Sequence, residues 1–214
     1  MPEIKRISLT AIAAVLALAA APVVADPWLK PGDLALRHDI QLLADAGVLR
    51  SPVTTWPIPW ATIAADLGDG GGLEALDPAV LAARVRVLQR FNRVRGLGGF
   101  QPNAKLGVRS DDFWLRNFED TPREQGEARA GVSWMGERFA ARAQLSFASD
   151  PRPGDREWRG DGSYLAAVIG NHIVHAGALD RWWGPSHDDT LILSSNARPV
   201  PGFGIERSAA LPFR

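Results

Sequence analysis

The sequence predicts a mainly β fold with a small α part: a helical N-terminal domain followed by antiparallel strands of an incomplete outer-membrane β-barrel. Three observations predict it. Residues 1–25 have the composition of a secretory signal, the apolar period changes from helical to alternating after Gly98-Gly99, and the first alternating strands are about ten residues long. The predicted parts are a signal peptide at 1–25, a small helical periplasmic domain at 26–99 and the first transmembrane barrel strands at 100–214.

The charge balance and the absence of cysteine exclude several classes of protein. The 214 residues contain 24 basic and 24 acidic side chains, so no net field attracts nucleic acid and no nucleic-acid partner is expected. Without cysteine there are no disulfides, thiolate metal ligands or cysteine nucleophiles. Eight tryptophans against one tyrosine fit a membrane interface or a sugar-binding surface, although tryptophan also fills protein cores.

The N-terminal segment is typical of a cleaved export signal. Lys5 and Arg6 provide a positive end, residues 7–21 form an apolar run, and Val23-Val24-Ala25 places small residues at the cleavage site. The apolar run is short for a transmembrane helix, so an uncleaved anchor is the weaker alternative. The mature chain is expected to begin near Asp26 in an exported compartment.

Residues 26–99 contain start and stop signals for three short helices. Asp33 can cap the first helix, which Gly47 ends. The prolines of Ser51–Pro59 predict an extended connector, after which a second helix runs from Trp60 to Leu67 and a third begins at Asp77-Pro78. The third helix carries a row of arginines, which predicts either a solvated surface or a contact with the barrel, a partner or an acidic polymer: Arg86, Arg90, Arg93 and Arg95.

A hairpin between Glu127 and Ala148 is the strongest evidence for β-structure. Apolar and polar residues alternate along both halves, and a two-residue turn at Gly136-Glu137 would pair Trp134 with Phe139. Every apolar residue then lies opposite another apolar residue, and the charged and polar residues share the other face. A slip of one residue would destroy this agreement.

Strand length favours a membrane barrel over a soluble sandwich. A tilted strand crosses a bilayer in roughly 9–11 residues, whereas soluble strands average about 5–6. Trp134 and Phe139 also lie together at the hairpin end, where an aromatic girdle is expected. Residues 150–162 are polar and rich in proline and glycine, which predicts a loop. The other predicted strands are Lys105–Val108, Phe113–Phe118, Tyr164–Ile169, His172–Leu179, Thr190–Ser194 and Phe203–Arg207.

The predicted strands, with the two of the hairpin, number about eight. About eight strands are the lower limit for closure, and Leu211-Pro212-Phe213-Arg214 is not a convincing closing strand. We therefore expect a truncated barrel. An open sheet edge in hydrocarbon leaves backbone groups unpaired, so such strands need to close or to associate.

The segment Gly177–Arg198 contains the densest set of groups that can bind a ligand. Sugars present apolar ring faces and many hydroxyls, so their sites combine flat aromatic rings with side chains that donate and accept hydrogen bonds. Two interpretations remain open: direct contact with a polysaccharide, in which arginines hold uronic carboxylates, or bracing of the lumen by Asp–Arg pairing and packed tryptophans. The candidate residues are Asp180, Arg181, Trp182, Trp183, Asn196 and Arg198.

The same segment is a weak candidate for catalysis. Adjacent Asp188 and Asp189 on a strand would point to opposite faces, which separates the two carboxylates that glycoside cleavage needs. The histidines lack a tight metal-ligand spacing, and Ser186-His187-Asp188 are sequence neighbours, not a triad. We therefore expect no catalytic residue, no metal site and no cofactor, and we place His172 and His175 on opposite faces of the wall.

Two blocks of this region are distinctive: Arg181–Pro185 (RWWGP) and Leu191–Pro199 (LILSSNARP). Together with Ser163–Ala166, Gly170-Asn171 and Ala176–Asp180, they resemble the capsule assembly protein Wzi family. The order of the chain fits as well, from signal through helical part to antiparallel strands. His187-Asp188-Asp189 departs from the glycine- or aromatic-rich turn expected after RWWGP, and the chain resembles only the N-terminal portion of such a barrel.

The resemblance implies an outer-membrane protein of the Gram-negative cell surface that binds and retains capsular polysaccharide or exopolysaccharide. The implied binding is lectin-like and non-enzymatic. The alternatives are a pore for diffusion or export and, less favoured, a glycan-processing hydrolase. The implied partners are capsular polysaccharide, outer-membrane lipid and other capsule-export proteins, and the implied location is the outer membrane with the helical domain in the periplasm.

Overall fold

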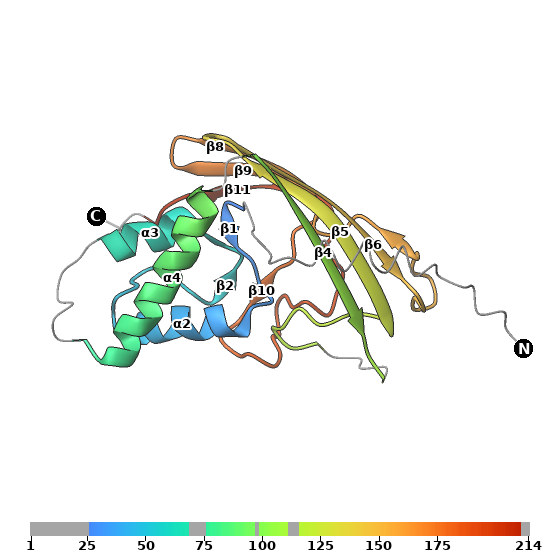
Figure 1. Ribbon diagram of the computed structural model, residues 1–214, viewed down its shortest axis with the longest axis horizontal. Coiled ribbons are helices and arrows are strands. Elements are labelled where there is room, and N and C mark those ends of the chain that lie inside the picture. Colours follow the sequence, from blue (N-terminus) through green and yellow to red (C-terminus); the bar gives the residue numbers. More distant parts are fainter. Residues whose placement is uncertain (1–25, 69–75, 97–98, 111–115, 211–214) are drawn as a thin grey trace, which may run out of the picture.

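A computed structural model describes residues 26–68, 76–96, 99–110 and 116–210, so the predicted signal peptide lies outside the described residues. Three helices lie on one side of a curved antiparallel sheet (Figure 1). The helices are α2 (Leu34–Asp45), α3 (Trp60–Gly68) and α4 (Pro78–Gly96). The sheet contains β4 (Phe100–Val108), β5 (Gly126–Met135), β6 (Phe139–Ala148), β7 (Trp158–Arg159), β8 (Tyr164–Ile169), β9 (His172–Gly177) and β11 (Gly202–Arg207).

The helix starts follow the sequence signals. Asp33 caps α2, since its carboxylate accepts a hydrogen bond from the Leu36 amide at 2.9 Å, and Gly47 follows the helix end with a φ of 72°. At the start of α4, the Asp77 carboxylate accepts a hydrogen bond from the Ala79 amide at 2.7 Å. The predicted helix starts at Asp33, Trp60 and Asp77-Pro78 are therefore confirmed.

The predicted connector Ser51–Pro59 contains two short strands, β2 (Thr55–Trp56) and β3 (Ile58–Pro59). β3 pairs with β1 (Trp28–Leu29), and β2 pairs with β10 (Trp182–Trp183), so this connector links the N-terminus to a segment more than a hundred residues later. The connector is extended, as predicted, because its prolines disfavour helix.

The main sheet is a meander of antiparallel neighbours in the order β11-β9-β8-β6-β5-β4. β7 pairs with the far end of β6, beside the stretch that pairs with β8. Among the described residues, the edge strands β4 and β11 do not pair with each other, so the sheet is open. Neighbouring strands that are joined in sequence are typical of up-and-down barrels.

The two faces of the sheet have opposite polarity, and the apolar face points away from the helices. Large apolar side chains on this outer face are exposed: Phe100, Leu106, Val108, Phe139, Leu145, Leu165, Ile169, Phe203 and Ile205. The polar residues that alternate with them are buried or half-buried on the inner face: Asn103, Glu127, Arg129, Ser133, Arg142, Gln144 and Ser146. This pattern confirms the predicted division of faces and matches a barrel wall whose outside contacts lipid.

The register of the β5–β6 hairpin differs from the prediction by two residues. Trp134 lies opposite Ala141, not Phe139, and the last pair is Met135 with Ala140. A two-residue turn of the favoured type needs left-handed backbone at its central residues, and Gly136 does not adopt it. The chain instead makes a wider turn in which the Gly136 amide donates to the Phe139 carbonyl at 2.8 Å. A shift of two residues keeps every side chain on its predicted face.

The remaining strand predictions have mixed outcomes. β8 has the predicted bounds, β9 ends two residues earlier than predicted, β4 begins earlier at Phe100, and β11 covers the predicted strand at 203–207. The predicted strand Thr190–Ser194 is wrong, because only Leu193 forms a bridge, to Trp183. The predicted strand Phe113–Phe118 is also wrong in its described part, residues 116–118, and its residues 113–115 lie outside the described residues.

The described residues form two apolar clusters, one among the helices and one under the sheet. The larger lies among the three helices and includes two side chains from distant segments, Phe118 of a loop and Trp182 of β10. The smaller lies under the sheet, where Trp28 packs edge-on against Tyr164 at a ring-centroid distance of 5.2 Å. Trp28 thus fixes the start of the described chain to the inner face of the wall. Within the described ranges, no helix has the length and apolar character needed to cross a membrane.

Candidate functional site

The two predicted tryptophans lie in different surroundings. Trp182 is 0% exposed and packs edge-on against Phe118 at 5.5 Å, and its indole nitrogen donates to the Ser186 carbonyl at 3.1 Å. Its ring therefore offers no face to a sugar in this structure. Trp183 is half-buried in β10, and Arg181 lies 6.0 Å above its ring. Of the two rings, Trp183 is the one with accessible surface.

Arg37 of α2 helps to hold the turn after these tryptophans. Its guanidinium donates to the backbone carbonyls of Gly184, Pro185 and Ser186 at 2.8–3.1 Å and stacks 4.2 Å from the Phe118 ring. Because the group is buried, the pKa of Arg37 falls to about 10, which still leaves it charged near neutrality. The RWWGP block is thus clamped to the helical region.

Asn196 and Arg198 line an arginine-rich pocket of about 260 Å³, and Asp180 contacts its lining, whereas Arg181 lies outside it. Asn196 accepts a hydrogen bond from the Arg116 amide, and Asp180 lies 3.3 Å from the Arg123 guanidinium. Arg198 contacts both oxygens of Asp161 at 2.8 and 3.0 Å. The pocket lining is Arg116, Arg123, Glu124, Arg152, Asp155, Asn196, Ala197 and Arg198.

Sequence reasoning missed the arginines that dominate this pocket. Arg116 and Arg123 lie in the loop before β5, and both donate to the Ser195 carbonyl, at 2.9 and 2.6 Å. Burial lowers the pKa of Arg116 to about 10, and the neighbouring Arg123 charge acts in the same direction. The pocket brings together loops about eighty residues apart, so no local pattern marked these side chains.

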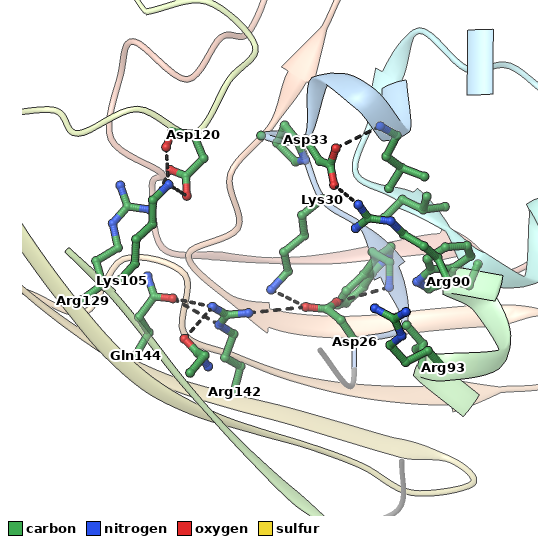
Figure 2. Close-up of a pocket in the computed structure, with 18 of the residues that line it drawn as sticks. Asp26, Lys30, Asp33, Arg90, Arg93, Lys105, Asp120, Arg129, Arg142 and Gln144 are labelled. Atoms are coloured by element: carbon green, nitrogen blue, oxygen red, sulfur yellow. Dashed lines mark hydrogen bonds and ion pairs between the residues drawn. The ribbon is translucent and has the colours of Figure 1, made fainter. Parts of the chain in front are cut away.

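A larger cavity of about 490 Å³ lies between the helical region and the inner face of β4, β5 and β6 (Figure 2). Arg90 and Arg93 reach it from α4, and Arg129 and Arg142 reach it from the strands. Six basic side chains and three carboxylates line it: Lys30, Arg90, Arg93, Lys105, Arg129 and Arg142 with Asp26, Asp33 and Asp120. The alternation of β5 and β6 predicts polar residues on this face, but the cavity itself was not foreseen.

Asp120 is the most strongly paired carboxylate of the cavity. It contacts Arg129 at 2.7 Å, Lys105 at 2.8 Å and Arg116 at 3.4 Å. Burial alone would raise the pKa of Asp120, but the charges of Arg129 and Lys105 outweigh it and lower the pKa to about 2. This carboxylate is therefore fully ionised at neutral pH.

The other two carboxylates are also engaged by cations. Asp26 is buried, pairs with Lys30 and lies 3.9 Å from Arg142, and Asp33 contacts Arg90 at 2.6 Å. Burial lowers the pKa of Lys30, against the opposing effect of the Asp26 charge. Every carboxylate in the lining thus faces a cation, and the cations remain in excess.

The described residues contain no group of three or more His, Cys, Asp or Glu side chains that could hold a metal ion. His175 is buried on the inner face against Trp28, whereas His172 is exposed on the outer face, which confirms their predicted separation. Asp188 and Asp189 lie in an exposed loop instead of a strand. What the site offers chemically is an array of fixed cationic and amide donors, suited to holding anions and hydroxyls.

The family model of the capsule assembly protein Wzi matches residues 100–214, which is more than half of the chain. This chain belongs to that family. A solved structure of Wzi from Escherichia coli, an outer membrane protein involved in group 1 capsule assembly and described as a carbohydrate-binding β-barrel, superposes with a TM-score of 0.67 at 22% identity. At this identity the likeness shows the fold: the sheet corresponds to part of such a barrel.

A relative from Klebsiella pneumoniae, an uncharacterized 55.8 kDa protein in the cps region, is 25% identical over 184 residues. The match covers 82% of this chain but 34% of the relative, and the Escherichia coli match covers 85% of this chain and 40% of that structure. The chain therefore spans roughly a third to two fifths of these proteins.

Proposed function

We propose that this chain is part of an outer-membrane β-barrel that retains capsular polysaccharide at the cell surface by non-covalent, non-catalytic binding. The observation that carries the proposal is the polarity of the wall: apolar side chains point outward while cationic and amide groups line the inner face. An apolar outer face suits lipid, and a cation-rich interior suits a hydroxylated, acidic polymer. Family membership and the carbohydrate-binding description of the Escherichia coli protein support it.

The proposed polysaccharide contacts are the accessible members of the predicted set. Asn196 and Arg198 line the smaller pocket, and Asp180 pairs with an arginine of its lining. Trp183 lies in β10, and Arg181, just before that strand, lies 6.0 Å from its ring centroid. Trp182 has the bracing role instead, because a fully buried ring cannot stack on a sugar. Outer-membrane lipid and other capsule-export proteins are proposed as further partners.

The proposed location is the outer membrane, with the helical region in the periplasm and the signal peptide removed. Because the chain has no cysteine, a single cysteine can be introduced at an exposed position of the helical region, Gln89 in α4. A membrane-impermeant maleimide added to intact cells should leave Gln89→Cys unlabelled until the outer membrane is opened. Labelling of Gln89→Cys on intact cells contradicts a periplasmic helical region.

Deletion of the gene tests the retention role. Cells should still make the polymer, but the cell-bound fraction should fall and the fraction in the medium should rise by the same amount, with the wild-type gene restoring retention. Unchanged retention overturns the proposal. Polymer of greater length in the deletion strain points to a hydrolase, and conductance of the purified protein in planar bilayers points to a pore.

A further inference from the structure

We propose that the 490 Å³ cavity between α4 and the sheet is a binding subsite for a uronic acid residue of an acidic saccharide. Its volume lies in the range of small-ligand sites, roughly 300–1,000 Å³. The inference rests on the proposed function and deepens it, since it names the chemical class of the polymer and a site distinct from the Gly177–Arg198 segment.

The charge of the lining selects an anion. Six cations face three carboxylates, and each carboxylate already contacts at least one cation. Arg93 is the exception among the cations: within the part of the chain that the structure describes, its guanidinium makes no ion pair or hydrogen bond. A partly enclosed site with walls of low dielectric concentrates the field of such an excess. The cavity thus retains one guanidinium for an incoming carboxylate.

The positions of the strand cations are fixed before any ligand arrives. Arg142 donates to Gln144 at 2.7 Å and to Asn103 at 3.3 Å, and Arg129 is held between Glu127 at 2.6 Å and Asp120 at 2.7 Å. Preorganised guanidinium groups lose little freedom on binding, and their planar fork matches a carboxylate in two-point contacts.

The mixture of charges favours a sugar acid over a phosphate. The carboxylates of Asp33 and Asp120 can accept hydrogen bonds from sugar hydroxyls, and the amides of Asn103 and Gln144 can both accept and donate them. The same carboxylates repel a phosphate, which carries up to two negative charges, more strongly than a single carboxylate. A uronic acid offers one carboxylate and several hydroxyls and so uses both parts of the lining.

The cavity also joins two regions of the molecule, because Arg90 and Arg93 come from α4 while Arg129 and Arg142 come from β5 and β6 (Figure 2). A saccharide bound there contacts both regions at once. It should therefore raise the melting temperature of the protein and protect the amides of α4 from hydrogen exchange, since it binds only the docked arrangement.

Calorimetry on the full-length gene product in detergent tests the proposal, with trigalacturonic acid, its carboxyl-reduced neutral counterpart and inorganic phosphate as probes. Trigalacturonic acid should bind, with affinity that falls as salt rises, and the other two should not. Arg93→Gln should weaken binding about tenfold, the usual effect of losing one charge-assisted hydrogen bond. The matched control is Arg95→Gln, which removes the same charge from the last turn of α4 but lies outside the cavity lining and should leave the affinity within about twofold.

Equal binding of the neutral trisaccharide, preferred binding of phosphate, or equal effects of Arg93→Gln and Arg95→Gln overturns the subsite. Capsule release by the deletion strain, taken together with binding of trigalacturonic acid by the purified protein, separates this proposal from the retention role. If the deletion strain releases capsule but purified protein does not bind trigalacturonic acid, the subsite is wrong and the retention role stands. If the probe binds and the deletion strain retains its capsule, the retention role is wrong and the saccharide site stands.

Discussion

The helical region and the sheet place the same kinds of side chain in opposite surroundings. In the helices, Leu43 and Ile63 are 0% exposed, whereas on the sheet Leu165 is 68% and Phe203 88% exposed. The helical region follows the rule for proteins in water, with apolar groups inside. The sheet reverses it, which is stable only where the outer face meets lipid. The helical region is therefore built for water, and the outer face of the sheet for an apolar surrounding.

The inner face of the sheet carries buried charges beside its small apolar cluster. Arg159 and Glu124 form a buried ion pair at 3.0 Å, and Arg142 is held by hydrogen bonds to Gln144 and Asn103. Buried charges are tolerated when each has partners, because an unpaired one costs several kcal/mol. Such networks add to the small apolar cluster of Trp28 and Tyr164 in ordering this half of the molecule.

The largest expected loss of folding stability comes from removing one large side chain from the apolar core of the helical region. Trp182→Ala should destabilise the protein by about 3–5 kcal/mol, because it empties a fully buried site against Phe118, whose ring also packs on Trp56. Urea unfolding in detergent measures this loss. Trp158→Ala is the matched control, since Trp158 on β7 is 58% exposed, and it should cost less than about 1.5 kcal/mol. Equal costs for the two changes contradict the contrast between the regions.

A charge on the outer face of the sheet tests the other half of the comparison. Leu165→Arg should cost about 2–4 kcal/mol in phospholipid vesicles if Leu165 lies near the bilayer midplane, and less near an interface, because the guanidinium must leave water for hydrocarbon. Folding equilibria in vesicles give the value. Glu137→Arg, in the exposed β5–β6 turn, should cost little. A tolerated Leu165→Arg in vesicles means that this face meets water instead of lipid.

The sequence predicts these two environments because each has a periodic signature. Alternation in β5 and β6 assigns every side chain to a face, and Asp33 and Asp77 mark helix starts by local hydrogen bonding. The strand register was not predictable in the same way. It depends on the backbone of Gly136 in the turn, and a shift of two residues leaves the pattern of faces unchanged.

The candidate site was predictable only in part, because its parts come from distant segments. The composition of the segment Gly177–Arg198 indicates a ligand site. The neighbouring sequence does not indicate that Phe118 covers Trp182 or that Asn196 contacts Arg116. The arginines of both cavities are scattered singly through helices, strands and loops. Their convergence follows from the tertiary fold, which pairs the connector before α3 with β10 and brings α4 near the strands.

Protonation of Asp120 should weaken the junction between its loop and the sheet. The folded pKa of about 2 lies below the usual value of 3.8, so the stabilisation is fully present above about pH 4 and is lost as pH falls through about 2. The Asp120 side chain is 35% exposed, so solvent screening reduces the effect to about 1 kcal/mol. Urea unfolding at pH 5 and pH 2.5 should show this difference in wild type and a smaller one in Asp120→Asn. Identical pH dependence in both proteins contradicts the assignment.

The smallest stability effect belongs to Arg198, where bracing and sugar contact predict different results. Arg198 pairs with Asp161 and Asp155, but its side chain is 34% exposed, so Arg198→Ala should cost only about 0.5–1 kcal/mol. A double-mutant cycle with Asp161→Ala measures the pair directly. If Arg198 only braces the wall, Arg198→Ala should reduce capsule retention no more than the Asp155→Ala/Asp161→Ala double variant, since both remove the same two ion pairs. If Arg198 also contacts the polymer, Arg198→Ala should release more capsule than that double variant, because only the arginine supplies donors to a carboxylate.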